Sequence, residues 1–272
     1  MIKRLSLVLM AVSGMAYAQS SRFIYEVSMK IDSTAQPVVE TAYLDVTKDK
    51  SVFYGEKRVQ RDSLMEKSFQ TRTFNPSQMD QLRSKINYKI EKQVSEQKVV
   101  QKDRIGRDTY AYTEDRPLDW KIMPETSTIG DYKVQKAETD FAGRHWVAWF
   151  TQDVPVMDGP YKFYGLPGLI VKVEDSKGDY SFDLKETKNL NSFPNLSERG
   201  NIISVKRKDY NKQLERYKKD PVSYMTQSRA NMPSPPGGGG NAPRQLDPER
   251  EKEMQPRMLE EIRTNNNPIE LN

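Results

Sequence analysis

Cysteine is absent from this chain of 272 residues, and histidine occurs once, at position 145. Without cysteine the protein has no disulfide, no thiol nucleophile and no thiolate metal site, so its stability must come from packing. A zinc site needs several nitrogen or sulfur ligands, and His145 alone argues against one. We therefore expect neither a metal nor another cofactor. A Ser-His-Asp triad would have to use His145, but the sequence has no Gly-x-Ser-x-Gly elbow, which favours a structural histidine.

Long hydrophobic runs are also absent, with one exception at the N-terminus. Lys3 and Arg4 precede an apolar run over residues 5–15, and Ala16-Tyr17-Ala18 forms an A-x-A cleavage site. Residues 1–18 therefore have the features of a cleavable signal peptide, and the apolar run is too short to anchor the chain in a bilayer. We expect an exported protein, periplasmic or secreted, with no integral membrane segment after cleavage.

A strong charge of one sign is missing as well. The 43 Lys and Arg residues stand against 38 Asp and Glu residues, which gives a formal net charge of +5. Opposite charges are interleaved along the chain, as in Glu249-Arg250-Glu251-Lys252-Glu253. This pattern is typical of a solvated surface rather than of a basic patch, so we expect no nucleic-acid partner.

The sequence does contain a clear strand rhythm. Apolar and polar residues alternate over residues 23–31 and in several later segments, which indicates half-buried strands. Between residues 60 and 87 the apolar spacing changes to three and four, and Asn75-Pro76-Ser77 divides two predicted helices. The pattern predicts a mainly β fold of the α+β class. We expect about ten strands in one curved antiparallel sheet, an open barrel or a sandwich, with a helical insert near residues 60–87 and C-terminal helices.

The predicted organisation along the chain follows these patterns. A β-rich part covers residues 19–206, including a short strand at 120–122, and a helical extension covers residues 207–230. Residues 231–246 are rich in proline and glycine and predict a flexible linker. Residues 247–272 then form a last helix and a tail.

The most distinctive stretch is a hinge over residues 158–170, rich in glycine and proline. Leu166-Pro167-Gly168-Leu169 fits a type II turn, because proline presets φ at the second position and glycine accepts a positive φ at the third. Between this turn and Gly159-Pro160, we expect Tyr161 and Phe163 on one side of an extended segment.

Gly159-Pro160-Tyr161-Lys162-Phe163, followed by Gly165-Leu166-Pro167-Gly168-Leu169-Ile170, resembles the stretch for which the GLPGLI family of exported bacterial proteins is named. The resemblance extends to residues 143–151, 120–122 and 266–271. It implies that residues 19–206 form a β-rich GLPGLI-type domain of the Bacteroidetes, a family without an established activity. Many members carry a cysteine near residues 133–137, where this chain has none, which argues against a thiol-based role.

A ligand-binding hypothesis follows from the aromatic and basic residues around the hinge. The candidates are Trp120, Arg144, Trp146, Trp149, Tyr161, Lys162 and Phe163. In one interpretation they form a concave apolar surface for an acyl chain, a peptide or a glycan ring, with Arg144 and Lys162 at its rim. In the other interpretation the aromatic residues are simply a β core.

Three functions remain open from the sequence alone. We favour a non-enzymatic binding or chaperone-like protein that holds an apolar or extended ligand, such as a lipid, a peptide or a glycan, on a curved sheet. The second is a hydrolase that uses Asp153 and Asp158 as acid and base, although Asp before Gly-Pro is an ordinary turn residue. The third is a structural interaction module of an outer-membrane transport system, with the linker and last helix as a tether.

Overall fold

The structure, a computed structural model, describes residues 20–193, 196, 201–230 and 248–271. The predicted signal peptide (1–18) and the predicted linker (231–246) lie outside these residues. Among the described helices, none is long and apolar enough to cross a membrane. The same residues hold no group of three or more acidic or histidine side chains that could bind a metal ion.

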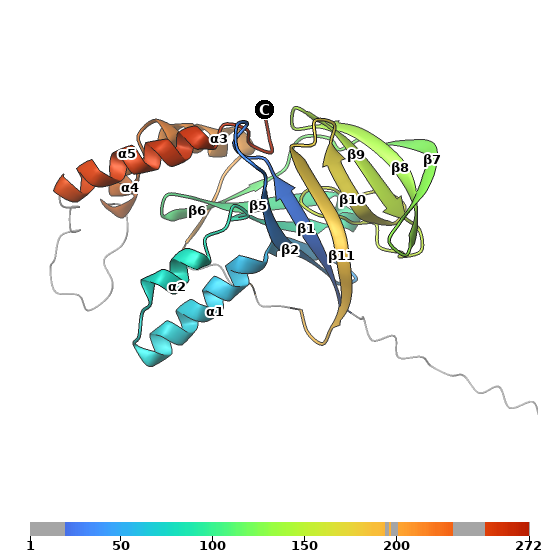
Figure 1. The fold of residues 1–272 in the computed structure, drawn as a ribbon, viewed down its shortest axis with the longest axis horizontal. Helices are drawn as coiled ribbons and strands as arrows, with labels where there is room; N and C mark the ends of the chain where they lie inside the picture. The colour runs from blue at the N-terminus through green and yellow to red at the C-terminus, as the bar shows by residue number, and fades with distance from the viewer. Residues whose placement is uncertain (1–19, 194–195, 197–200, 231–247, 272) are drawn as a thin grey trace, which may run out of the picture.

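Twelve strands of the described chain form one open sheet (Figure 1). Their order across the sheet is β12-β6-β5-β4-β3-β2-β1-β11-β10-β9-β8-β7, and β12 alone pairs in parallel, with β6. In chain order they are β1 (Ser20–Met29), β2 (Val38–Val46), β3 (Ser51–Gly55), β4 (Lys89–Gln93), β5 (Lys98–Ile105), β6 (Asp108–Thr113), β7 (Lys121–Ile129), β8 (Tyr132–Phe141), β9 (Arg144–Thr151), β10 (Leu169–Asp175), β11 (Tyr180–Leu190) and β12 (Ile202–Ser204). The predicted fold class, a mainly β protein with a curved antiparallel sheet, is confirmed.

Strand β1 occupies the middle of the sheet because it pairs with β2 on one side and with β11 on the other. Phe23, Tyr25 and Val27 are buried and alternate with more exposed residues along β1. This period of two directs one face of the strand into the core and fixes its register. The β1–β11 pairing joins the meander β1–β6 to the meander β7–β11.

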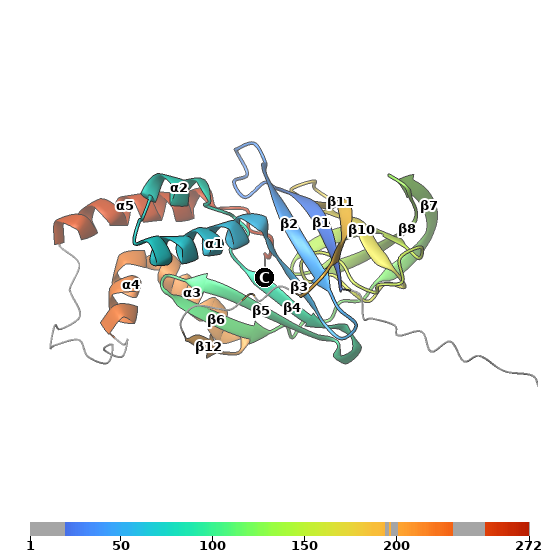
Figure 2. The same cartoon turned by 90° about the horizontal axis from the view of Figure 1, so that it is seen from below.

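The sheet is strongly curved, and its inner face packs around an aromatic core (Figures 1 and 2). Phe163 lies at the centre of this core. Its ring centroid is 4.8 Å from that of Trp146 and 6.3 Å from that of Phe182, with both pairs in edge-to-face geometry. Such pairs add stability beyond the burial of their area. All three side chains are fully buried, so this part of the inner face is filled by the protein itself.

Two helices, α1 (Glu56–Thr71) and α2 (Pro76–Gln81), interrupt the strands between β3 and β4 and form an arm beside the sheet (Figure 2). Asn75 caps α2, since its side-chain oxygen accepts hydrogen bonds from the N–H groups of Ser77 and Gln78 at 3.1 and 3.4 Å. These helices are the insert predicted near residues 60–87, although they begin earlier and end sooner.

In the described part of the chain, three helices follow the sheet: α3 (Arg207–Lys219), α4 (Pro221–Ala230) and α5 (Pro248–Thr264). Helix α3 packs on β5 and β6 through Tyr210, whose ring centroid lies 4.8 Å from that of Tyr112. Helix α5 packs against α4. The residues after α5 then return to the sheet, between the end of β1 and the β8–β9 turn (Figure 1).

The C-terminal half of the hinge differs from the prediction. The N–H of Gly168 donates to the carbonyl oxygen of Leu166 at 2.7 Å, and φ of Gly168 is +150°. The predicted type II turn is therefore replaced by a tighter turn that closes from i to i+2. Glycine is required here, because a Cβ at position 168 would lie 1.9 Å from the carbonyl oxygen of Thr151.

The N-terminal half of the hinge is a turn rather than the expected extended segment. The N–H of Phe163 donates to the carbonyl oxygen of Pro160 at 3.1 Å, and Tyr161 has a φ of +53°. A bulky residue rarely adopts positive φ, so Tyr161 is held there by its surroundings. The turn buries Tyr161, Lys162 and Phe163 together instead of alternating them between two faces.

Candidate functional site

Residues 266–271, which we call the tail segment, lie between the end of β1 and the β8–β9 turn. The N–H of Asn267 donates to the carbonyl oxygen of Ile31 at 2.9 Å, and the N–H of Leu271 donates to that of Ala142 at 2.9 Å. These bonds fix the two ends of the tail segment on the sheet. The segment itself is neither helix nor strand.

Arg144, on β9, contacts the first half of the tail segment. Its Nη2 donates to Asn267 Oδ1 at 2.6 Å and to the Pro268 carbonyl at 2.8 Å. Its Nε donates to the Ile269 carbonyl at 3.1 Å. A planar guanidinium with several fixed donors suits this kind of contact with successive carbonyl groups.

Two carboxylates hold Arg144 from the opposite side. Its Nη1 donates to Asp175 Oδ2 at 2.8 Å and to Asp179 Oδ2 at 3.2 Å. The guanidinium carbon also lies 4.8 Å from the centroid of the Tyr180 ring, in cation–π geometry. With the tail segment in place Arg144 is only 5% exposed, and these contacts hold its guanidinium from the side opposite the tail segment.

Asn267 has a partner for each of its polar groups. Beyond the contacts with Ile31 and Arg144, its Nδ2 donates to the Lys30 carbonyl at 2.7 Å, and its own carbonyl accepts a hydrogen bond from Tyr180 Oη at 2.6 Å. Asn267 is half-buried, and this complete pairing favours an amide over other side chains at the position, because an amide that loses contact with water must find other partners.

Lys162, from the hinge, contacts the second half of the tail segment. Its ammonium donates to Glu270 Oε1 at 2.5 Å, to Glu114 Oε2 at 2.6 Å and to Tyr112 Oη at 2.9 Å. Arg116 Nη2 donates to Glu270 Oε2 at 2.9 Å and to Glu114 Oε2 at 2.8 Å. Two cations thus share two carboxylates, of which only Glu270 belongs to the tail segment.

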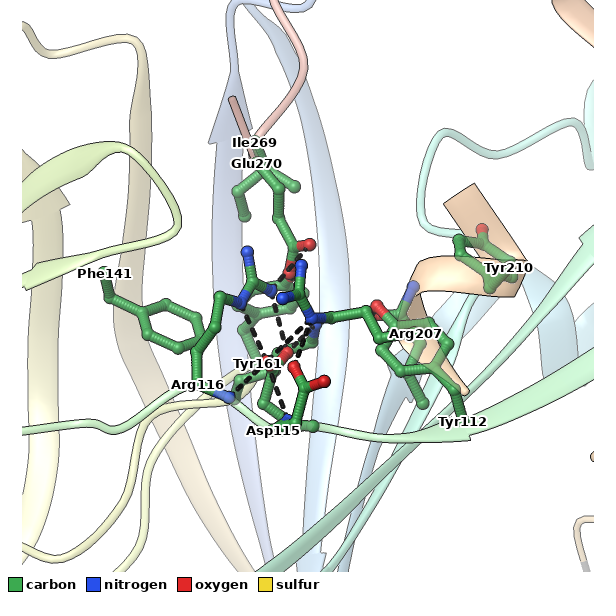
Figure 3. A network of polar contacts seen from close by, with 12 residues as sticks. Tyr112, Asp115, Arg116, Phe141, Tyr161, Arg207, Tyr210, Ile269 and Glu270 are labelled. Atoms are coloured by element: carbon green, nitrogen blue, oxygen red, sulfur yellow. Dashed lines mark hydrogen bonds and ion pairs between the residues drawn. The ribbon is translucent and has the colours of Figure 1, made fainter. Parts of the chain in front are cut away.

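Figure 3 shows Glu270 reaching from the tail segment toward Arg116 and Tyr161. The Tyr161 hydroxyl donates to Glu270 Oε1 at 2.5 Å. On the other side of the cluster, Arg207 Nε from α3 donates to Asp115 Oδ1 at 2.5 Å and lies 3.7 Å from Glu114. The strained backbone of Tyr161 therefore positions a side chain that binds the tail segment.

The charges of this cluster lower the pKa values of both glutamates. Burial acts to raise the pKa of Glu114, but hydrogen bonds from Arg116 and the charge of Lys162 outweigh it and lower the pKa to about 2. Burial likewise acts to raise the pKa of Glu270, and the charges of Lys162 and Arg116 outweigh it, so that this pKa is also lowered. Both side chains are carboxylates at neutral pH.

The residues of the sheet and hinge that contact the tail segment form what we call the cradle. They are Lys30, Ile31, Arg116, Ala142, Arg144, Tyr161, Lys162 and Tyr180. The Ile269 side chain adds an apolar contact, because it packs against the main hydrophobic core. The cradle therefore holds the tail segment through separate contacts with an amide, main-chain carbonyls, an aliphatic side chain and a carboxylate.

The structure brings three of the predicted ligand-binding residues to the cradle. Arg144 and Lys162 lie inside the protein, 5% and 1% exposed, rather than at the rim of a surface. Tyr161 contributes its hydroxyl to the cradle and its ring to the core. Trp146 and Phe163 are wholly core residues, so for these two the alternative interpretation, a β core, describes their environment.

The remaining predicted residues lie elsewhere. Trp120 is partly buried, and its indole N–H donates to the Tyr164 carbonyl at 2.9 Å. Trp149 projects from the opposite face of β9 to Trp146, where its cross-strand neighbours are Lys136 on β8 and Lys172 on β10. The indole N–H of Trp120 is thus directed at the hinge rather than at the tail segment.

The two aspartates of the hydrolase hypothesis have different environments. Asp158 is 2% exposed, and its Oδ1 lies 2.5 Å from the ammonium of Lys92, which is itself fully buried. Asp153 is exposed in the loop after β9. His145 is half-exposed on the outer face, with Nδ1 2.8 Å from Asp140 Oδ1. The Asp158 carboxylate is thus paired with Lys92, and this pair fixes the hinge.

Sequence reasoning missed Glu114, Arg116 and Glu270. Glu114 and Arg116 stand in a charged loop between β6 and β7 that has the appearance of an ordinary solvated connection. Glu270 lies in a segment that belongs to the family resemblance, and that resemblance was the only available signal. It marked the tail segment without indicating what the segment contacts.

The structure is a curved, open β-sheet that holds its own tail segment at one end. A family model described as "Protein of unknown function (Porph_ging)" matches residues 141–172, which run from the end of β8 through the hinge into β10. No curated protein matches the chain.

Two solved structures of PNGF-II, in the P21 and C2 space groups, are similar to this structure, with TM-scores of 0.55 and 0.54. Their sequence identities to this chain are 18% and 17%. Each match covers 74% of this chain and 34% of the PNGF-II chain, so this chain spans about a third of the length of PNGF-II. At this level of identity the similarity concerns the fold alone.

Proposed function

We propose that this protein is an exported, non-enzymatic binding protein that holds a short polypeptide segment in the cradle of its curved sheet. The observation that carries the proposal is the pair of buried cations, Arg144 and Lys162. Both direct hydrogen bonds at one non-helical segment, to two of its main-chain carbonyls and to two of its side chains. Main-chain contacts supply affinity and side-chain contacts supply specificity in peptide recognition.

The other ligands considered from the sequence have less support. A lipid or glycan would need an open apolar surface, and Trp146, Tyr161 and Phe163 are buried in contact with one another. An acid–base pair would need Asp158 free to react, and Lys92 holds it. The GLPGLI motif over residues 159–170 lies within the matched stretch 141–172, and we propose that the chain is a member of the GLPGLI family.

The binding proposal is tested with the complete chain after export and removal of residues 1–18. A protease site is placed within the glycine run at residues 237–240, so that the protein folds intact and is cut afterwards. We expect a labelled peptide of residues 248–271 to exchange into the cut protein, and an unlabelled copy to displace it. The same exchange is measured in a Lys162→Gln variant, in which we expect at least about tenfold weaker retention, corresponding to about 1.4 kcal/mol.

Two outcomes would contradict the proposal. In the first, the cut fragment leaves and the labelled peptide does not enter, although the remaining sheet keeps its near-ultraviolet circular dichroism. In the second, the peptide is retained equally by the Lys162→Gln protein and by a control with a change at an exposed lysine, Lys185→Gln. The first result would mean that the cradle does not bind a peptide reversibly, and the second that the peptide is not held through Lys162.

A further inference from the structure

The open sheet has two edges, and they are protected to different extents (Figure 2). At one edge, β12 has only three residues, Ile202–Ser204, and such a short strand offers little for another strand to pair with. At the other edge, β7 has nine residues, Lys121–Ile129, and in the described chain it pairs only with β8. The first half of β7 contains Pro124, a register shift and the charged residues of the strand, all of which keep other strands away. The second half, Thr126–Ile129, has none of these features.

The turn that follows β7 determines which main-chain groups of this second half face outward. The turn has two residues, so Ile129 and Tyr132 on either side of it exchange main-chain hydrogen bonds. Bonded and non-bonded pairs then alternate along the antiparallel ladder. The N–H and C=O groups of Ser127 therefore bond to β8, while those of Thr126 and Thr128 point away from the sheet. Two residues thus present unpaired donors and acceptors at this edge.

The edge is also accessible from the concave side of the sheet. Gln135 on β8 is the cross-strand neighbour of both Thr126 on β7 and Phe150 on β9, so these three side chains share the inner face. Beside them lies a hollow of about 590 Å³, lined also by Thr128 and Gln152. Thr126 and Thr128 are themselves exposed. A strand added at this edge would therefore continue the sheet without displacing a described part of the protein.

The sequence of this edge suits pairing with a second copy of itself. We infer that two molecules of this protein associate through β7, in antiparallel orientation, about a two-fold axis at Ser127. In this register Thr126 of one molecule faces Thr128 of the other, so the outward groups meet in about four main-chain hydrogen bonds. Cross-strand threonine pairs add to the stability of a sheet, and residues 126–129 bring no like charges together across the axis. The partner of this edge is therefore a second copy of the chain.

This inference does not rest on the proposed function. The cradle lies at the β8–β9 turn, beside Ala142 and Arg144, whereas the unprotected part of β7 lies next to Tyr132, at the other end of β8. Dimerisation through β7 would leave the cradle of each molecule unchanged. The two can therefore be tested separately.

Because the chain has no cysteine, a single introduced thiol reports the register of the dimer. On the two-fold axis Ser127 faces its own counterpart as a non-bonded pair, with Cα atoms about 4.5 Å apart, which suits a disulfide. In the mature full-length chain, Ser127→Cys should form a covalent dimer under mild oxidation at least about tenfold faster than Glu125→Cys, because position 125 faces Ile129 of the other molecule. Lys185→Cys, at an exposed lysine of β11, is the control for random collision.

Sedimentation equilibrium measures the association without a cross-link. The average mass of the wild-type chain should rise with concentration, as in a reversible dimer. Thr128→Pro removes one outward N–H and leaves the bonds to β8 in place, so the dimer should be at least about tenfold weaker. Thr128→Val keeps that N–H and the branched side chain and should behave as wild type. Ser127→Lys places like charges across the axis and should also weaken the dimer, and an equal mixture with Ser127→Glu should restore it.

Two results would overturn the inference. One is a chain that stays monomeric at every concentration while the three cysteine variants cross-link equally slowly, even if an unrelated polypeptide binds the edge. The other is a dimer that Thr128→Pro and Thr128→Val affect equally, or that the mixture of Ser127→Lys and Ser127→Glu does not restore, since it would then use another surface. Near-ultraviolet circular dichroism shows whether each variant is folded. If Thr128→Pro is not, the charge variants at Ser127 decide the question.

Discussion

Glu114 is the residue whose ionisation contributes most clearly to stability. Its pKa in the folded protein is about 2, against an ordinary value of 4.5. A carboxylate with a lowered folded pKa stabilises the protein at pH values above its unfolded pKa, and this contribution is lost as the pH falls from about 4.5 to about 2. With allowance for solvent screening, the contribution at neutral pH is about 2–3 kcal/mol.

We therefore predict that Glu114→Gln flattens the acid limb of the stability profile. Urea unfolding at pH 6.5 and pH 3 should give a smaller drop in the free energy of unfolding for the variant than for wild type, by about 1–2 kcal/mol. Part of the drop persists because the pKa of Glu270 is lowered as well. A control at the exposed Glu125 should follow the wild-type profile. Equal drops in all three proteins would refute the assignment.

The Lys92–Asp158 pair fastens the hinge to β4. The Lys92 ammonium is fully buried, lies 2.5 Å from Asp158 Oδ1 and donates to the Gly159 carbonyl at 2.5 Å and the Phe163 carbonyl at 3.2 Å. Burial lowers the pKa of Lys92, and the charge of Asp158 opposes this shift. Each buried ion therefore depends on the other.

We predict that Lys92→Met alone destabilises the protein by about 3–5 kcal/mol, because it leaves Asp158 buried and uncompensated. The double change Lys92→Met with Asp158→Asn should cost less than the sum of the two single changes, since no lone charge remains. Chemical denaturation of the four proteins in a double-mutant cycle measures this coupling. Additive effects would mean that the pair does not act as a unit.

Among the secondary-structure elements, the β9–β10 connection depends most on a single glycine. At Gly168, φ is +150° and an added Cβ would lie 1.9 Å from the Thr151 carbonyl oxygen. Gly165, in the same hinge, also has a positive φ, +89°, but an added Cβ would have no atom within 4 Å. Alanine substitutions at the two positions therefore distinguish the effect of steric overlap from the effect of backbone strain.

We predict that Gly168→Ala costs at least about 3 kcal/mol, from combined strain and overpacking. Gly165→Ala should cost about 1–2 kcal/mol, from strain alone. Thermal and urea unfolding of both variants give the comparison. Similar losses at the two positions would show that the close approach to Thr151 is relieved by a small shift of the β9–β10 connection.

The elements that could be predicted from sequence are those in which the alternation of apolar and polar residues shows which face is buried. β1 and the β10–β11 hairpin alternate because one of their faces is in the core. The strand expected at 120–122 is in fact β7, Lys121–Ile129, an edge strand with no buried residue and a register shift around Pro124. Edge strands tolerate proline at such irregularities. This edge strand also lacks an alternation of apolar and polar residues, so hydrophobic periodicity underestimates its length.

The cradle could not be predicted from the sequence for a different reason. Its contacts join residues that are distant in sequence, such as Arg144 with Pro268 and Lys162 with Glu270. Hydrophobic periodicity reports which side of an element is buried, but it does not report which charged side chains meet. The sequence pattern therefore identified Arg144 and Lys162 as notable, and only the fold identified what they bind.

At the scale of the whole molecule, the tail segment and α5 form a unit that is fastened at two places. Helix α5 packs against α4, and Lys85 lies 3.9 Å from Glu261 at its side. The tail segment is fastened through the cradle. Neither part is a strand of the sheet in the described chain. Both sides of β1, the strand next to the tail segment, are occupied by β2 and β11. The unit can therefore open while the sheet stays folded, as local units of low stability do.

We predict that Glu270→Ala promotes this opening without destabilising the sheet. The change removes the carboxylate that compensates Lys162 and Arg116, so amide hydrogen exchange over residues 248–271 should accelerate at least about tenfold, while β1 and β11 exchange as in wild type. Leu271→Ala, at a half-exposed side chain, is the matched control and should leave the exchange pattern unchanged. Acceleration spread evenly over the sheet would mean that the tail segment is an inseparable part of the core, and a cradle that cannot empty could not bind a second polypeptide.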